Sequence, residues 1–324
     1  MSDTNYSSTT NLEIVLMGIP GLHGTQQWLS IPVFIMFLVA FFGNLTILLT
    51  IVTDQSLHEP MHYFISMLSA VDLIVTIALL PNCLNVLWFG SQTLSYNACL
   101  VQLFFTSCFC AVESTILILM AYDRYVAVCN PLRYRTIIQK SALKVSLIVG
   151  VRGLSGTLPV LLLVPILLNC KETIVLSLFC DYFAFARGMC SHIFVIDNYV
   201  YVPILLLLLL DITIIIFSYF MVARAALKLG LRESRQKIFY TCSSHIFVIA
   251  SFYFCAAVST ITLFFDKKIP EHIRTLFSII YFTVPPTLNP LIYGIKTKEI
   301  RKCILEYVRK YSMHLSRECA KLVH

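Results

Sequence analysis

Hydrophobic residues in this chain form seven long blocks that are separated by short polar segments. The blocks cover about residues 29–53, 61–88, 97–122, 141–168, 195–223, 238–264 and 273–295. A helix needs about 20 apolar residues to cross a hydrocarbon core of about 30 Å, and each block is long enough. Backbone polar groups must be satisfied within the segment in lipid, so blocks of this length predict helices. The pattern therefore predicts an all-α membrane protein, a seven-transmembrane helix bundle.

The segments outside the blocks predict the rest of the organisation. Residues 1–27 are polar and are expected to form an extracellular N-terminal tail, with a glycosylation acceptor at Asn5. They lack a basic region followed by an apolar one, so no cleaved signal peptide is expected. Residues 28–295 form the membrane domain. Residues 296–324 are basic and amphipathic, which predicts a short helix on the inner membrane surface followed by a cytoplasmic tail.

Composition and charge support this organisation. Of the 324 residues, 58% are hydrophobic and only 13% are charged, whereas ordinary globular chains carry roughly twice that charge. With the N-terminus outside, 18 of the 24 lysines and arginines lie on the inner side. Inner loops of membrane proteins are enriched in these residues, so the pattern predicts an extracellular N-terminus and a cytoplasmic C-terminus at the plasma membrane. The net charge of +7 thus indicates a membrane-facing surface and does not indicate nucleic-acid binding.

Four of the twelve cysteines are expected outside, namely Cys99, Cys170, Cys180 and Cys190. The outer side is oxidising, so four cysteines predict two disulfides with three possible pairings. Zinc is the competing interpretation, but the gaps between these cysteines do not match the short ligand pairs of zinc sites. The last three lie in a long segment, 169–194, which is expected to form an ordered lid.

Polar residues within the blocks should face the bundle interior, because they are costly in lipid. They are Asn44, Asp72, Glu113, Arg152, Asp211 and Asn289. Each either holds helices together by a hydrogen bond or serves function. Three of them lie near mid-depth and are expected to converge on a cation or a water cluster, a possible sodium site: Asp72, Glu113 and Asn289. The arginine needs a carboxylate or several carbonyls as partners.

No enzyme, cofactor or metal centre is expected, because the chain has no catalytic constellation, no phosphate-binding loop and no second metal ligand after His58-Glu59. A transporter should show two similar halves with matched broken helices. A chain with seven spans cannot be divided into two such halves, and no matched pair of broken helices is visible in it. An ion channel or transporter that uses the buried acids remains a remote alternative.

Several motifs resemble those of rhodopsin-like G-protein-coupled receptors. They are Gly43-Asn44, Asp72, the triplet Asp123-Arg124-Tyr125 and the string NPLIY at 289–293. More specific strings are similar to odorant receptors: PMHYFIS at 60–66, MAYDRYVAVCNPLRY at 120–134 and KIFYTCSSH at 237–245. The string GIPGL at 18–22 and the long outer loop with three cysteines resemble the class I, or fish-like, branch. A non-olfactory chemosensory receptor of the same fold remains an alternative.

The resemblance implies how the receptor would signal. It implies the disulfides Cys99–Cys180 and Cys170–Cys190. It implies that Arg124 is held by Asp123 at rest and is released toward a heterotrimeric G protein of the olfactory, stimulatory type that raises cyclic AMP. The implied coupling and switch residues are Asp123, Arg124, Tyr125, Tyr219, Lys237, His245, Asn289, Pro290 and Tyr293.

The resemblance also implies a ligand site in the outer half of the bundle. Thr106, Ser107, Cys110 and Ala111 share one face of the third block by helical spacing. The implied partners are Phe183, Val200, Ile204, Tyr253, Ala257, Thr260 and Phe282. This lining suits a small, mostly apolar odorant. An amine would lack a counter-ion at Thr106, and Phe264 offers no cation to an acid, although Lys171, Arg187, Lys267 and Lys268 could supply charge from the rim.

Overall fold

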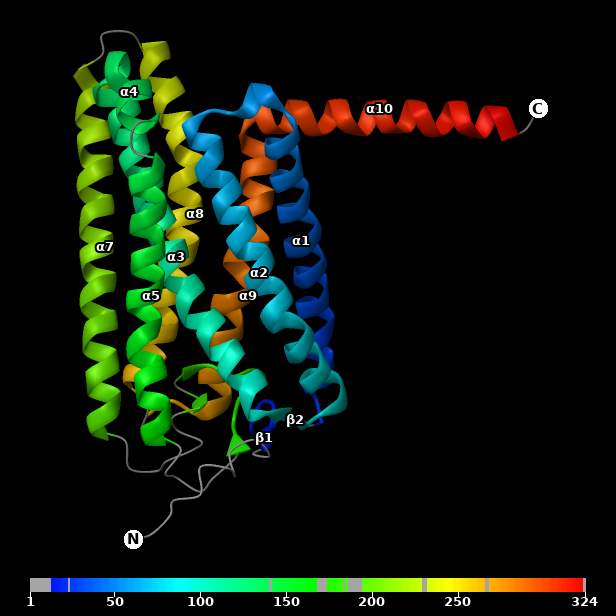
Figure 1. The fold of residues 1–324 in the computed structure, drawn as a ribbon, viewed down its shortest axis with the longest axis vertical. Coiled ribbons are helices and arrows are strands. Elements are labelled where there is room, and N and C mark those ends of the chain that lie inside the picture. The colour runs from blue at the N-terminus through cyan, green and yellow to red at the C-terminus, as the bar shows by residue number, and fades with distance from the viewer. Residues whose placement is uncertain are drawn as a thin grey trace.

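The computed structural model describes residues 13–22, 24–139, 142–167, 174–182, 184–185, 194–228, 232–265 and 268–322. Within these residues seven long helices lie side by side as a bundle (Figure 1). They are α1 (Gln26–Thr53), α2 (Pro60–Phe89), α3 (Tyr96–Cys129), α5 (Ala142–Leu167), α7 (Phe194–Lys228), α8 (Arg232–Phe264) and α9 (Glu271–Lys296). Each coincides with one of the seven hydrophobic blocks, so the predicted helix bundle is confirmed.

The outside of the bundle is apolar, which is the reverse of a soluble protein. Large hydrophobic side chains such as Phe42, Phe217 and Phe254 are exposed along the helices. Among the described residues, all of the seven long helices except α5 are both long and apolar enough to cross a membrane. The helix α5 runs beside α3 over 26 residues, which is about 39 Å at 1.5 Å per residue. The bundle therefore presents a surface suited to lipid.

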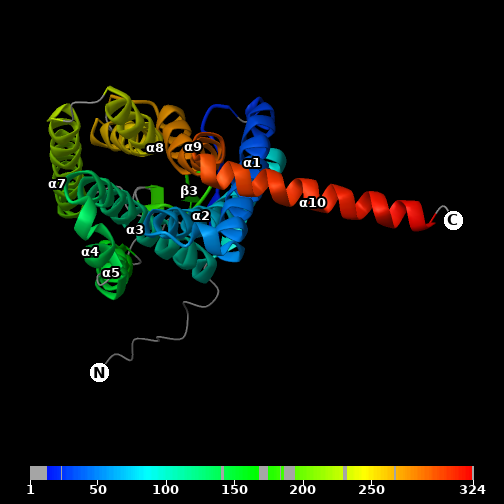
Figure 2. The same ribbon diagram turned by 90° about the horizontal axis from the view of Figure 1, so that it is seen from above.

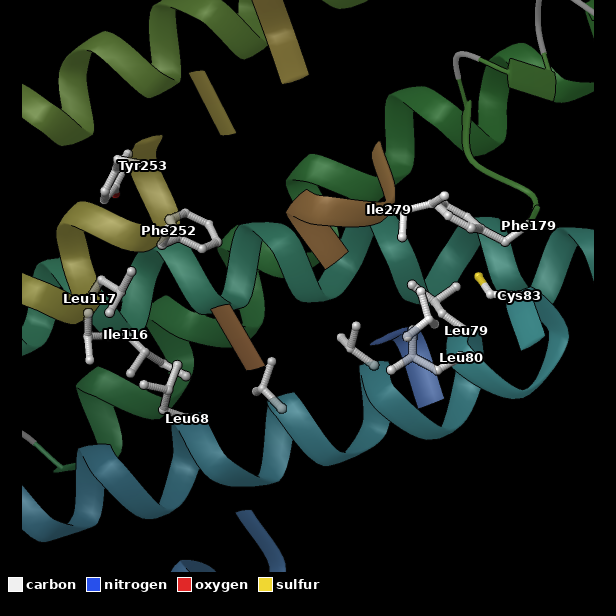
Figure 3. Packing of buried hydrophobic residues seen from close by; sticks show 14 of the residues in the cluster. Leu68, Leu79, Leu80, Cys83, Ile116, Leu117, Phe179, Phe252, Tyr253 and Ile279 are labelled. Carbon is white, nitrogen blue, oxygen red and sulfur yellow. The ribbon is translucent and has the colours of Figure 1, made fainter. Parts of the chain in front are cut away.

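Buried aliphatic side chains fill the space between the helices. Figure 3 shows Leu68 and Leu79 of α2 together with Leu117 of α3, Phe252 of α8 and Ile279 of α9. Hydrophobic burial drives this packing much less in lipid than in water, so close approach of helices depends on small residues and on polar contacts.

One such close approach joins α1 to α9. A Cβ added at Gly43 would lie 2.8 Å from the Pro290 side chain, so only glycine fits there. Pro290 has no backbone N–H and therefore leaves the carbonyl of Pro286 without its helical donor. The Nδ2 atom of Asn44 donates to that carbonyl at 2.9 Å. The first helix thus supplies the hydrogen-bond donor that Pro290 cannot provide.

Three strands close one end of the bundle, which we call the sheet end. The strand β1 (Glu13–Leu16) lies between β2 (Gln92–Ser95) and β3 (Ile174–Val175). It pairs antiparallel with β2 and parallel with β3. The hydrophobic pattern did not reveal these strands, because very short strands that pair distant segments leave no periodicity for the sequence pattern to show.

The disulfide Cys99–Cys180 also lies at the sheet end and joins α3 to the segment that follows β3. Next to it, the Gln102 side chain donates to the carbonyl of Ala78 at 3.0 Å and accepts from the backbone N–H of Cys180 at 2.7 Å. The second predicted pair, Cys170–Cys190, lies outside the described residues, as does Asn5.

The opposite end of the bundle carries two short 3-10 turns (Gln55–Leu57 and Pro131–Arg133), the short helix α4 (Tyr134–Gln139) and the helix α10 (Lys298–Leu322). Figures 1 and 2 show α10 running across this end and well beyond the bundle. The predicted amphipathic helix is present, but with 25 residues it is longer than the short helix expected. The extra length comes from 309–322, over which the helix continues.

Candidate ligand cavity and signalling face

A cavity of about 680 Å³ lies between five helices near the sheet end. Sites for small molecules commonly measure about 300–1,000 Å³ and are mostly apolar with a few polar groups. The α3 wall is formed by Thr106, Ser107, Cys110, Ala111 and Ser114. The other walls come from α5, α7, α8, α9 and the segment 176–184.

Glycines on α5 bring this helix close to α3 beside the cavity. A Cβ added at Gly156 would lie 3.0 Å from the Cβ of Ala111, and one at Gly153 would lie 2.8 Å from Val112. Small residues at these positions let the backbones of α3 and α5 approach closely.

A buried ion pair forms the floor of the cavity. The Nη2 atom of Arg152 on α5 lies 2.5 Å from the Asp211 carboxylate on α7. Asp211 also accepts a hydrogen bond from the hydroxyl of Ser114, which lies 3.2 Å from the hydroxyl of Tyr253 on α8. Asp211 is thus a carboxylate partner of the kind that the sequence predicted for Arg152. The network of these four side chains links α3, α5, α7 and α8 at the cavity.

Arg274 is a wall residue that the sequence reasoning missed. It lies on α9, is only 7% exposed, and its Nη2 atom is 3.3 Å from a carboxylate oxygen of Glu271. The sequence analysis considered a ligand charge only at Phe264 and at the rim residues Lys171, Arg187, Lys267 and Lys268. A helical projection of α9 would have placed Arg274 on the same face as Ser278, Tyr281 and Phe282, all of which line the cavity.

The structure brings most of the predicted ligand residues to the cavity wall. They are Thr106, Ser107, Cys110, Ala111, Ile204, Thr260 and Phe282. Tyr253 and Ala257 do not line it, and Tyr253 reaches it only through the network beneath. Phe183 lies outside the described residues, and so does the side chain of Val200.

The predicted convergence of polar residues in the bundle interior involves α2, α3 and α9. The Nδ2 atom of Asn289 donates to the Asp72 carboxylate at 2.9 Å, and Glu113 lies close enough to interact with both. Among the described residues, one carboxylate oxygen of Asp72, one of Glu113 and the amide oxygen of Asn289 have no hydrogen-bond partner. No group of three or more histidines, cysteines or acids in the described part of the chain is placed to hold a metal ion.

The end opposite the sheet carries a second ion pair, at the C-terminal end of α3. The Asp123 carboxylate is 1% exposed and accepts from the Nη2 atom of Arg124 at 2.5 Å. The hydroxyl of Tyr134 on α4 donates to the other carboxylate oxygen at 2.8 Å. Burial, together with the negative charge of Asp123, raises the pKa of the Tyr134 phenol, so it stays a proton donor at neutral pH. The resemblance implied the contact between Asp123 and Arg124, but it did not point to Tyr134.

The other predicted switch residues lie around this pair. Tyr293 of α9 is buried, and its ring centroid is 5.7 Å from that of His245 on α8. Its hydroxyl lies 3.9 Å from the sulfur of Met120 on α3. Tyr219 on α7 is half-buried, and the side chain of Lys237 lies outside the described residues. These rings join α3, α8 and α9 at the level between the polar cluster and Arg124.

Comparison with known proteins gives a consistent result. A family model for olfactory receptors matches residues 33–310. The chain is 37% identical to olfactory receptor 52N4 of Homo sapiens, over 97% of this chain and 100% of that protein. It is 36% identical to human olfactory receptor 52B2, over 93% of this chain and 94% of that protein. It is 40% identical to human olfactory receptor 52Z1P, over 89% of this chain and 97% of that protein.

Proposed function

Since the chain belongs to the olfactory receptor family, we propose that the cavity of about 680 Å³ is where it binds odorants. The protein is an odorant receptor of the class I branch, a multi-pass protein of the plasma membrane, and not an enzyme. Receptors of this family respond to odorants through G proteins, and a rise in cyclic AMP is typical of them.

The observation that carries the proposal is the position of the cavity above the Arg152–Asp211 network. A ligand in the cavity contacts α3, α5, α7, α8 and α9 at once, and it lies within one layer of side chains of Tyr253. A ligand shifts a conformational equilibrium only if it binds one state better than the other. A ligand in contact with a network that joins four helices can bind more tightly to one arrangement of these helices than to another.

The ligand proposed for this cavity is small and mostly apolar, with one hydrogen-bonding group. Apolar side chains dominate the α5 and α7 walls, for example Val151, Leu207 and Leu208. Polar contacts are available from the hydroxyls of Ser107 and Thr260 and from Arg274. The phenyl ring of Phe282 packs edge-on against Phe179 at a centroid distance of 5.2 Å and closes the α9 side.

We propose that the sheet end faces outside and that the opposite end faces the cytoplasm. A disulfide forms in an oxidising compartment, which supports the outer placement of Cys99–Cys180. The enrichment of lysine and arginine toward the other end supports the inner placement. Asn5 would then be open to glycosylation, and Cys170–Cys190 would form the second bridge of the outer loop.

Signalling is proposed to run from Tyr253 along α8 to His245 and Tyr293, and from there to Arg124. The proposed G-protein coupling and switch residues are Asp123, Arg124, Tyr125, Tyr219, Lys237, His245, Asn289, Pro290 and Tyr293. Its partner would be a stimulatory, olfactory-type G protein. The cluster of Asp72, Glu113 and Asn289 is proposed to hold either a sodium ion or shared protons at rest, since several of its oxygens lack hydrogen-bond partners among the described residues.

A cyclic AMP assay with an odorant panel tests the cavity. For an odorant with one hydroxyl or carbonyl, Ser107→Ala or Thr260→Val should raise the half-maximal concentration about two- to tenfold, because a net hydrogen bond is worth roughly 0.5–1.5 kcal/mol. Thr213→Val is the matched control, since Thr213 is exposed on the outside of α7 and should leave the response unchanged.

Two results would contradict the proposal. Unchanged responses in both cavity variants across the whole panel would show that the odorant binds elsewhere. A response restricted to carboxylates and lost in Arg274→Gln would show that the ligand is an acid and not a mostly apolar odorant.

A further inference from the structure

A second cavity, of about 580 Å³, lies on the lipid-facing side of α2 and α3 and is separate from the odorant cavity. We call it the α2–α3 groove. It is lined by Ile74, Ile77, Ala78, Asn82, Asn97, Ala98, Val101, Gln102 and Phe105. The side chains of Ile77 and Val101 are each 55% exposed, so the groove opens toward the hydrocarbon and not toward the bundle interior.

The groove is polar at one end and apolar at the other. Asn82 and Asn97 lie toward the sheet end, whereas Ile74 and Phe105 lie eight residues away from them on their helices, which is about 12 Å deeper at 1.5 Å per residue. Trp88 and Phe89 follow on α2 and are 57% and 78% exposed. Exposed aromatic residues of this kind are typical of the membrane–water interface. The polar end therefore lies just below the headgroup level.

Hydrogen-bonding groups at this polar end are left for a ligand. Pro81 has no backbone N–H, so α2 supplies no helical donor to the carbonyl of Ile77. Within the part of the chain that the structure describes, the Asn82 side chain makes no hydrogen bond. Lipid offers few partners for such groups at this depth, so an amphiphile that both donates and accepts a hydrogen bond would be stabilised here.

Gln102 connects the groove to the odorant cavity. It forms part of the groove wall, and its amide holds the backbone of both Ala78 and Cys180. Cys180 directly precedes Asp181 and Tyr182, which line the odorant cavity. A molecule in the groove would therefore contact the side chain that positions residues 180–182 beside the odorant cavity.

We propose that the α2–α3 groove binds a sterol from the outer leaflet, with its hydroxyl at Asn82 and the carbonyl of Ile77 and its ring system against Ile74, Val101 and Phe105. The lining includes no lysine or arginine, so a phospholipid headgroup would find no cation for its phosphate. A rigid ring body also loses less conformational entropy on binding than an acyl chain does.

Photolabelling tests this proposal. The full-length receptor is reconstituted in phosphatidylcholine nanodiscs with a photoreactive cholesterol analogue, irradiated, and mapped by mass spectrometry. Labelling is expected within 74–105 and should be displaced by unlabelled cholesterol. Ile77→Trp fills the groove and should abolish this labelling. Asn82→Leu removes the hydroxyl partner and should weaken it about two- to tenfold.

Ile35→Trp on α1 is the matched control, because Ile35 is also 55% exposed and faces lipid away from the groove. It should leave the labelling unchanged. An odorant-evoked cyclic AMP response in each variant shows that the protein is folded. Labelling of 74–105 that persists in Ile77→Trp, or that unlabelled cholesterol fails to displace, would overturn the proposal.

Discussion

Replacing Asp211 by alanine should remove most of the receptor from the cell surface. The carboxylate is buried and is the partner of Arg152, whose side chain is 23% exposed and lines the odorant cavity. Removing one member of a buried pair leaves an uncompensated charge and costs about 3–5 kcal/mol. The same substitution also takes away the acceptor of the Ser114 hydroxyl. A loss of this size is a large fraction of the free energy of unfolding of a typical domain, which is about 5–15 kcal/mol.

The measurement is surface staining of an N-terminally tagged receptor, normalised to total protein. The double variant Arg152→Met with Asp211→Leu removes both charges and should restore surface staining, because an apolar pair of similar volume often replaces a buried ion pair without loss. Glu306→Ala is the control: its partner Lys302 lies 3.9 Å away, both side chains are largely exposed, and such a pair is worth less than about 1 kcal/mol. Normal staining of the Asp211→Ala receptor would show that the network is not structural.

Replacing Arg124 by glutamine should abolish odorant-evoked cyclic AMP while the receptor still reaches the surface. Arg124 is the only charged partner of the Asp123 carboxylate among the described residues, and glutamine can still donate a hydrogen bond to it. The proposed contact with the G protein needs the guanidinium itself. Losing a buried charge pair at an interface costs about 2–5 kcal/mol, so coupling should fall at least roughly 30-fold.

The reverse change at the same site should act in the opposite direction. Asp123→Asn weakens the restraint on Arg124 and should raise cyclic AMP in the absence of odorant. Arg133→Gln is the control, because Arg133 is exposed at the same end of the bundle and makes no ion pair within the described residues. Full signalling by Arg124→Gln, or reduced basal activity in Asp123→Asn, would contradict the proposed switch.

Hydrophobic blocks predicted the bundle well because each membrane helix satisfies its own backbone and must be apolar along its whole length. The short strands were missed for the converse reason. Residues Glu13–Leu16 form a strand only because β2 and β3 flank them, and these lie at 92–95 and 174–175 in the sequence. The local pattern of hydrophobic and polar residues carries no information on pairing between segments so far apart in the sequence.

The same limit explains which site residues were found. The contact between Asp123 and Arg124 was implied by the resemblance to receptors of known families, whereas Arg152 and Asp211 are 59 residues apart and were recognised only as two separate polar residues. Arg274 and Tyr134 were missed because their roles depend on which face of a helix turns inward. The number and position of charges along the sequence do not show which face of a helix turns inward.

The central claim is that odorants act from the cavity of about 680 Å³, and a pair of tryptophan variants on α9 tests it most directly. Ser278 lines the cavity, whereas Ile280, two residues later, is 39% exposed on the outer surface. Dose–response curves for cyclic AMP are recorded for Ser278→Trp and Ile280→Trp, normalised to surface staining. The account predicts that Ser278→Trp loses the response to every odorant that activates the unchanged receptor, while Ile280→Trp keeps it. Equal responses of the two variants would contradict it.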